Sequence, residues 1–149
     1  MPNTVFTNAR ILDGTGDSSF SGEVRVDGNR IRQISSDGSP LSHDDADVID
    51  CAGATLMPGL VEAHAHPSFG NTSTLEALGE VPIEEHTLMT MKHVKLLLDQ
   101  GFTSINSAAA AKARLDVVIR NAINAGDIPG PRMLAASPEL TPTSGLGDV

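Results

Sequence analysis

The sequence predicts an α/β protein built in two parts. Up to about residue 57, short apolar or alternating segments separated by turn residues indicate a small all-β domain. From Pro58 onward the pattern changes to strand, helix, strand, helix and strand with short connections. Because this order favours parallel strands joined by right-handed crossovers, we expect two domains, at residues 1–57 and 58–149.

Each β segment of the first part ends at a turn signal. Residues 5–12 are typical of a strand, which ends at the turn cluster 13–17. Residues 22–26 and 30–34 alternate polar and apolar side chains around the Asp-Gly-Asn turn 27–29, which indicates a hairpin. The other elements expected in this part are an exposed loop at 35–47 and short strands at 48–50 and 54–57.

Helix and strand signals alternate in the second part. Pro82 and Gly101 bound a helix over 83–100, because proline suits the first turn and glycine follows the last one. Apolar residues recur along this segment with a period of 3.6. The other expected elements are strands at 60–66, 102–106 and 133–136 and a second helix at 114–125.

The composition narrows the range of partners. Acidic residues outnumber basic ones by 19 to 10, and this formal charge of −9 disfavours nucleic acid and anionic membranes. Cys51 is the single cysteine, so no intrachain disulfide forms and we expect a buried or half-buried side chain. The N-terminus lacks a basic stretch followed by an apolar one, and no apolar run approaches about 20 residues. We therefore expect a cytoplasmic protein.

The segment Pro58–His66 carries the clearest chemical signal. Its apolar run ends in two histidines, His64 and His66, which are separated by one residue. Because strand side chains alternate, Glu62 and both histidines are expected on one face. Two neutral imidazoles side by side suit neighbouring ligands of one metal ion. The spacing makes His64 and His66 candidate metal ligands, with unrelated surface or core histidines as the alternative.

The segment Pro-Gly-Leu-Val-Glu-Ala-His-Ala-His resembles the first barrel strand of the amidohydrolase superfamily. Residues 8–16, 49–53 and 101–105 resemble further segments of the same family. The resemblance implies the N-terminal part of a (β/α)8 TIM-like barrel, preceded by a small all-β domain that belongs to a composite β-sandwich. Because such a barrel takes about 250 residues, we expect an N-terminal fragment in which the barrel is incomplete.

The resemblance also implies a function. The complete protein would be a metal-dependent hydrolase that cleaves an amide, peptide-like or other C–N bond of a small-molecule substrate through metal-activated water. It would hold one or two ions of zinc or another divalent metal, and the resemblance implies that His64 and His66 are ligands of one of them. The general base and the remaining ligands lie on later strands in the family. The fragment alone is therefore expected to be inactive, and either a homo-oligomer or completion by the rest of the barrel is expected.

Finer features point to one branch of the family. Residues 127–132 and 141–145 are most similar to the branch of Xaa-Pro dipeptidase-like and N-acyl-amino-acid-hydrolysing enzymes. Three positions depart from the usual pattern. Glu62 stands where the family has Asp, Asn106-Ser107 stands where this branch has Arg-Asp, and Leu146 stands where many members have His.

Other interpretations stay open at this point. A heterocycle deaminase uses the same first-strand motif, and a non-catalytic relative could serve as an assembly module. His86 and His93 lie two turns apart on the predicted helix, and we expect packed or solvated side chains there rather than ligands. Polar residues after the strands are candidate substrate contacts, with ordinary loop polarity as the alternative: Ser68, Asn71, Thr72, Ser107, Ser137 and Thr141.

Overall fold

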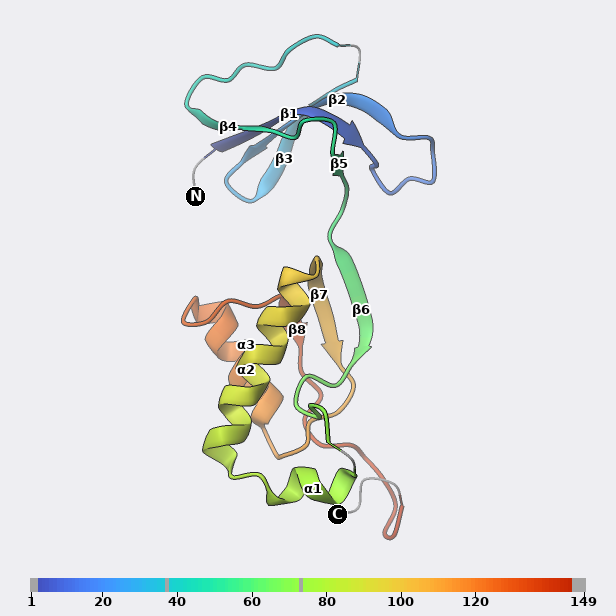
Figure 1. Ribbon diagram of the computed structural model, residues 1–149, viewed down its shortest axis with the longest axis vertical. Helices are drawn as coiled ribbons and strands as arrows, with labels where there is room; N and C mark the ends of the chain where they lie inside the picture. Colours follow the sequence, from blue (N-terminus) through green and yellow to red (C-terminus); the bar gives the residue numbers. More distant parts are fainter. Residues whose placement is uncertain (1–2, 37, 73, 146–149) are drawn as a thin grey trace. The chain divides into compact units, whose positions relative to one another are not determined.

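The computed structural model describes residues 3–36, 38–72 and 74–145. The chain divides into two compact units, Met1–Pro58 and Gly59–Val149 (Figure 1). In the described residues, the first unit consists of strands and loops, and the second combines parallel strands with helices. The chain is therefore a mixed α/β protein.

The first unit forms a five-stranded sheet within its described residues. β1 (Asn3–Ile11) pairs antiparallel with β2 (Phe20–Asp27), and β2 pairs antiparallel with β3 (Arg30–Ser35), as the predicted hairpin requires. On the other side of β1, both β4 (Ala46–Asp50) and β5 (Thr55–Leu56) run parallel to it. β1 is thus the central strand of a mixed sheet.

A small apolar cluster stabilises this sheet. Ala9, Ile11 and Val24 are buried in it, and Cys51 packs against them half-buried, as the sequence predicted. The segment 35–47 was expected to be an exposed loop, and this expectation is wrong at three places: Ser35 is buried at the end of β3, Leu41 is 8% exposed, and β4 begins at Ala46. Burial removes the apolar side chain of Leu41 from water, which is favourable.

The second unit contains a parallel sheet of three strands in its described part. β6 (Leu60–Ala65), β7 (Phe102–Ser107) and β8 (Arg132–Leu134) lie side by side in chain order. α2 (Ile83–Asp99) connects β6 to β7, and α3 (Leu115–Ala125) connects β7 to β8. This is the strand and helix alternation that the sequence predicts.

The core of the second unit lies between this sheet and its helices. Ala65, Ile105 and Met133 contribute one residue from each strand. Val94 from α2 and Ile119 from α3 pack against them, and all five side chains are buried. Both helices therefore cover the same face of the sheet (Figure 1).

The sequence missed the short helix α1 (Leu75–Glu80). Thr74 begins it, since its Oγ1 accepts a hydrogen bond from the backbone N–H of Ala77 at 3.3 Å. Six residues are too few to display a helical period, and Gly79 further weakens the helix signal. Only the capping residue carried information about this element.

Two strands end earlier than the sequence predicts. β6 ends at Ala65 rather than His66, because the backbone N–H of Phe69 bonds to the carbonyl of His66 at 3.0 Å and closes a turn. β8 ends at Leu134 rather than Ala136, whose backbone N–H donates to a side chain instead of a strand. In both places, contacts beyond the strand replace the sheet pairing.

The longest helix in the described part of the chain is α2, with 17 residues. It carries charged residues at both ends and in its middle. No helix among the described residues is long and apolar enough to cross a membrane. The cytoplasmic location expected from the sequence stays a prediction.

Asp50 joins the end of β4 to β1. Its Oδ1 accepts hydrogen bonds from the backbone N–H of Ala52 at 2.8 Å and from Asn8 Nδ2 at 2.9 Å. The bond from Ala52, followed by the one from Asn8, holds the pKa of the Asp50 carboxyl below its ordinary value of 3.8.

We expect the ionised Asp50 to stabilise the first unit above its unfolded pKa. This contribution is lost as the pH falls through the lower pKa of the folded state. Asn8→Gly should raise the Asp50 pKa toward 3.8 because one donor is removed, and glycine tolerates the positive φ of 51° at this position. NMR titration of the Asp50 carboxyl carbon in both proteins measures the shift. An equal titration midpoint in both would contradict the role of Asn8.

Candidate metal centre

Two imidazole rings lie together at the carboxyl end of β6. His64 Nε2 and His66 Nε2 are 3.1 Å apart, and the rings meet edge to face with their centroids 5.0 Å apart. His64 is exposed and His66 is half-buried. The two histidines singled out by their spacing thus present a pair of nitrogen atoms at one place.

The core packing explains why His64 is accessible. Ala65 is 6% exposed and faces the helices, so the preceding side chain points to the opposite face of the strand. The pairing of β6 with β7 also shifts register between Glu62 and Ala65. Irregularities of this kind redirect side chains near the ends of strands. His66 follows β6 directly and belongs to the turn beyond it.

Glu62 supports the backbone of the histidine segment. Its Oε1 accepts a hydrogen bond from the backbone N–H of His64 at 3.0 Å. The side chain reaches the backbone two residues further along the chain. At this position the departure from the family pattern therefore still gives a carboxylate that contacts the motif.

His66 is in contact with an aromatic side chain that sequence reasoning did not single out. The rings of His66 and Phe69 stack with centroids 4.4 Å apart and an angle of 29° between their planes. His66 Nδ1 is buried and has no hydrogen-bond partner among the described residues. One ring nitrogen therefore faces His64, and the other lacks a protein partner in this part of the chain.

The helix histidines bond to backbone carbonyl groups rather than to the pair, although His93 lines the same hollow as His64 and His66. His86 Nε2 bonds to the carbonyl oxygen of Ser68 at 2.6 Å, and His93 Nδ1 bonds to that of Pro67 at 2.9 Å. His86 is fully buried and His93 partly so, which agrees with the packed side chains that we expected. In residues 3–36, 38–72 and 74–145, no group of three or more His, Cys, Asp or Glu is placed to share a metal ion.

Three solved structures align with most of this chain. A prolidase in complex with N-methylphosphonate-L-proline aligns over 98% of this chain, with a TM-score of 0.87 and 27% identity. A Xaa-Pro dipeptidase with bound methionine in its active site also aligns over 98%, with a TM-score of 0.84 and 28% identity. An amidohydrolase aligns over 91%, with a TM-score of 0.80 and 26% identity.

The chain belongs to the amidohydrolase superfamily. Two curated members, both dihydroorotases, match it in sequence. The one from Syntrophotalea carbinolica is 33% identical over 76 residues, and the one from a Wolbachia of Drosophila simulans is 36% identical over 61 residues. No protein-family model matches the chain. The prediction of the superfamily is confirmed.

The match covers only part of each superfamily member. The chain spans 32–36% of the length of these three solved proteins. It spans 17% and 14% of the two dihydroorotases, which match 49% and 41% of this chain. The chain therefore aligns to a portion of amidohydrolase structures.

The candidate substrate contacts after the strands hold the loops together instead. Ser68 is 1% exposed, and its Oγ accepts from the backbone N–H of Ala111 at 2.8 Å. Ser107 is fully buried, and its Oγ donates to the carbonyl of Ala109 at 3.4 Å. Ser137 Oγ accepts from a backbone N–H, and Thr141 Oγ1 donates to the carbonyl of the next residue. For these four residues the structure supports the alternative of loop polarity; Asn71 and Thr72 are exposed.

Asp116 is a buried carboxylate that sequence reasoning missed. It is 1% exposed and lies in the first turn of α3. Its Oδ2 accepts from the backbone N–H groups of Ala136 and Ser137 at 2.9 Å each, and its Oδ1 accepts from that of Val117 at 2.8 Å. An acidic residue in the first turn of the helix was the available signal. Asp116 thus fixes the segment that follows β8.

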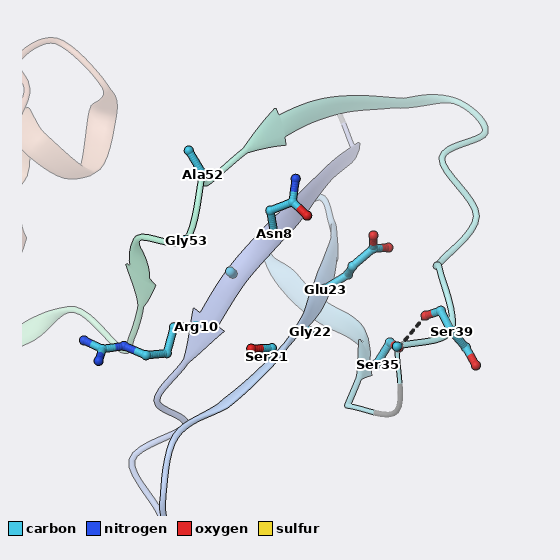
Figure 2. Close-up of a pocket in the computed structure, with 11 residues that line it drawn as sticks. Asn8, Arg10, Ser21, Gly22, Glu23, Ser35, Ser39, Ala52 and Gly53 are labelled. Carbon is cyan, nitrogen blue, oxygen red and sulfur yellow. Dashed lines mark hydrogen bonds between the residues drawn. The ribbon is translucent and has the colours of Figure 1, made fainter.

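The first unit has a separate polar hollow of about 660 Å³ (Figure 2). Several of its polar side chains form hydrogen bonds within the unit. Arg10 donates to Thr55 Oγ1, and the Glu23 carboxylate accepts from the backbone N–H of Leu41. Figure 2 shows the hydrogen bond from Ser35 Oγ to the carbonyl of Ser39. These lining side chains therefore already have hydrogen-bond partners within the protein.

We expect Asp116→Asn to lower the free energy of unfolding by about 2–4 kcal/mol. The amide replaces one acceptor oxygen by a donor, so buried backbone N–H groups lose their partner. Urea unfolding monitored by circular dichroism measures the change. Asp127→Asn, at an exposed position, is the matched control and should change stability by less than about 0.5 kcal/mol. Equal effects of the two variants would contradict the stabilising role of the Asp116 hydrogen bonds.

Proposed function

We propose that this chain supplies the first two metal ligands of a metal-dependent amidohydrolase that cleaves an amide, peptide-like or other C–N bond. The observation that carries the proposal is the 3.1 Å separation of His64 Nε2 and His66 Nε2 at the carboxyl end of β6. In sheets of parallel strands covered by helices, this end of the strands is where active sites are built. Membership of the superfamily supports the same assignment.

The distance between the two Nε2 atoms fits two ligands of one zinc ion. Two nitrogen ligands at 2.0–2.1 Å from a tetrahedral zinc ion lie about 3.3 Å from each other. The Nε2 atoms of His64 and His66 are 3.1 Å apart, close to that value. When Nε2 binds a metal, Nδ1 carries the proton and normally donates to an acceptor. His66 Nδ1 has no such acceptor in the described part of the chain. We therefore propose that the acceptor lies outside these residues.

Two ligands do not complete a catalytic site, which normally has three protein ligands. Among the described residues, no third His, Cys, Asp or Glu is placed to share a metal ion with the pair. The remaining ligands and the general base are therefore proposed to lie on polypeptide beyond the 149 residues. The family relatives are about three times as long as this chain, which agrees with that proposal.

A bound zinc ion would supply an activated water at neutral pH and polarise the scissile carbonyl group. The chain's own residues hold and orient the ion. His64 and His66 would bind it, and the Glu62 carboxylate accepts a hydrogen bond from the backbone N–H of His64. Phe69 covers one face of the His66 ring, which limits its rotation and shields it from water.

In the complete protein we assign the first unit to a small all-β domain of a composite β-sandwich. The second unit would be the first β/α units of a (β/α)8 barrel. The alignment of 98% of this chain with two peptidases of the superfamily supports this assignment. It also favours a small peptide-like or N-acyl-amino-acid substrate. The heterocycle deaminase and the non-catalytic assembly module stay alternatives, and a panel that includes aminated heterocycles, assayed with the complete protein, would separate them.

We expect the chain to bind Zn²⁺ through the histidine pair. His64→Ala and His66→Ala should each weaken binding at least tenfold, because one of two nitrogen ligands is lost. Isothermal titration calorimetry of the full 149-residue chain measures the affinity. His43→Ala is the control, since His43 lies in the first unit and should leave the affinity unchanged. Undiminished zinc binding by His64→Ala would overturn the ligand assignment.

We expect no hydrolysis by the zinc-loaded chain alone, because its site lacks ligands and a general base. A panel of Xaa-Pro dipeptides and N-acyl amino acids, followed by liquid chromatography, tests this. The mass and zinc content of the native protein form the companion measurement. A zinc-containing species of about three times 15.5 kDa would support a longer polypeptide. Turnover by the 149-residue chain that His64→Ala abolishes would show instead that its site is complete.

A further inference from the structure

The turn that follows β6 carries His66 at its first position. The backbone N–H of Phe69 bonds to the His66 carbonyl at 3.0 Å, which closes a four-residue turn. Pro67 at the second position restricts φ to a value that suits such a turn. The ring of Phe69 stacks on the ring of His66 across the closed turn. The conformation of this turn therefore sets where the His66 ring lies.

Two histidines of α2 bind the corner of this turn. His93 Nδ1 lies 2.9 Å from the carbonyl oxygen of Pro67, and His86 Nε2 lies 2.6 Å from that of Ser68. A carbonyl oxygen only accepts hydrogen bonds, so both ring nitrogens must donate. His86 and His93 are seven residues apart, which places them two turns apart along one side of the helix. The helix thus holds two consecutive carbonyl groups of the turn.

The burial of His86 argues against a role in packing alone. The side chain is 0% exposed, and its Nδ1 has no hydrogen-bond partner within the described residues. Burying a polar nitrogen without a partner costs free energy that an apolar side chain of similar size would avoid. The bond from Nε2 to Ser68 is what this histidine provides and an apolar residue would not.

Two further contacts come from the loop that follows β7. Ser68 Oγ accepts from the backbone N–H of Ala111, at 2.8 Å, in the segment after β7. The carbonyl of Ala65 accepts from the backbone N–H of Ala108, also at 2.8 Å. The end of β6 and its turn are therefore held from the helix and from the loop of the next strand.

We propose that His86 and His93 are positioning residues, which hold the His66 turn through the carbonyl groups of Ser68 and Pro67 and so orient His66 beside His64. The inference rests on the proposed metal site. Ligand orientation by hydrogen-bonded neighbours usually acts on the ligand ring itself. Here it acts on the backbone that carries the ligand.

Matched variants separate the hydrogen bond from the volume of the ring. His93→Leu and His86→Leu keep an apolar side chain of similar size but remove the donor. In His93→Asn the amide nitrogen takes about the place of Nδ1, and in His86→Gln it takes about the place of Nε2. The leucine variants should bind Zn²⁺ about tenfold more weakly in calorimetry, the lower end of the effect of orienting partners. The amide variants should recover most of the parental affinity.

A second readout needs no metal. The Phe69 ring displaces the NMR shifts of the His66 ring protons, since the two rings stack. These shifts should move toward free-imidazole values in the leucine variants and return in the amide variants. All measurements are made well below each variant's thermal unfolding midpoint. If a leucine variant does not fold, the amide variant at the same position and the other histidine still decide the result.

The outcomes distinguish this inference from the proposed function. Parental zinc affinity and parental His66 shifts in folded leucine variants would overturn the positioning role and leave the metal site intact. Equal losses in the leucine and amide variants would also overturn it, because the donor would then not matter. Zinc binding that is insensitive to His64→Ala would overturn the proposed metal site, whatever the helix variants do. Weak binding and shifted His66 protons in the leucine variants, with recovery in the amides, support the positioning role.

Discussion

Burial of Ala65 between the parallel sheet and its helices decides which way the histidine strand faces. Apolar burial is the main favourable contribution to folding, and a strand has only two faces. A shift of β6 by one residue would turn His64 into the helix-covered core and Ala65 outward. The packing of Val94 and Ile119 on that face therefore also sets the accessibility of His64, whose side chain points to the opposite face of the strand.

Buried polar groups in the second unit are concentrated beyond the carboxyl ends of the strands. Ser68, His86 and Asp116 are each no more than 1% exposed, and each is hydrogen-bonded to backbone of a loop or turn. Buried hydrogen bonds of this kind stabilise one conformation, because an unpaired polar group in the interior is costly. The end of the sheet that carries the histidine pair is thus built from fixed loops, as preorganised ligands require.

The sequence predicted the parts of this structure that depend on local pattern. Periodicity located α2 and α3, and the spacing of His64 and His66 predicted that they lie together. What it missed depends on contacts between distant residues. Asp116 binds the N–H of Ala136, 20 positions away, and no local pattern marks that partner or the early end of β8. The acceptors of the helix histidines are backbone carbonyl groups, which every residue has and which no sequence pattern distinguishes.

The groups that hold the His66 turn are close together in the sequence, which has a consequence for folding during translation. Ser68 and His86 are 18 residues apart, and Pro67 and His93 are 26 apart. Loops of this length close at modest entropic cost, and the N-terminal side of a polypeptide folds first as it emerges from the ribosome. Once the ribosome has released α2, both sides of these contacts are present. The two contacts between α2 and the His66 turn can then form cotranslationally, before α3 and β8 have emerged.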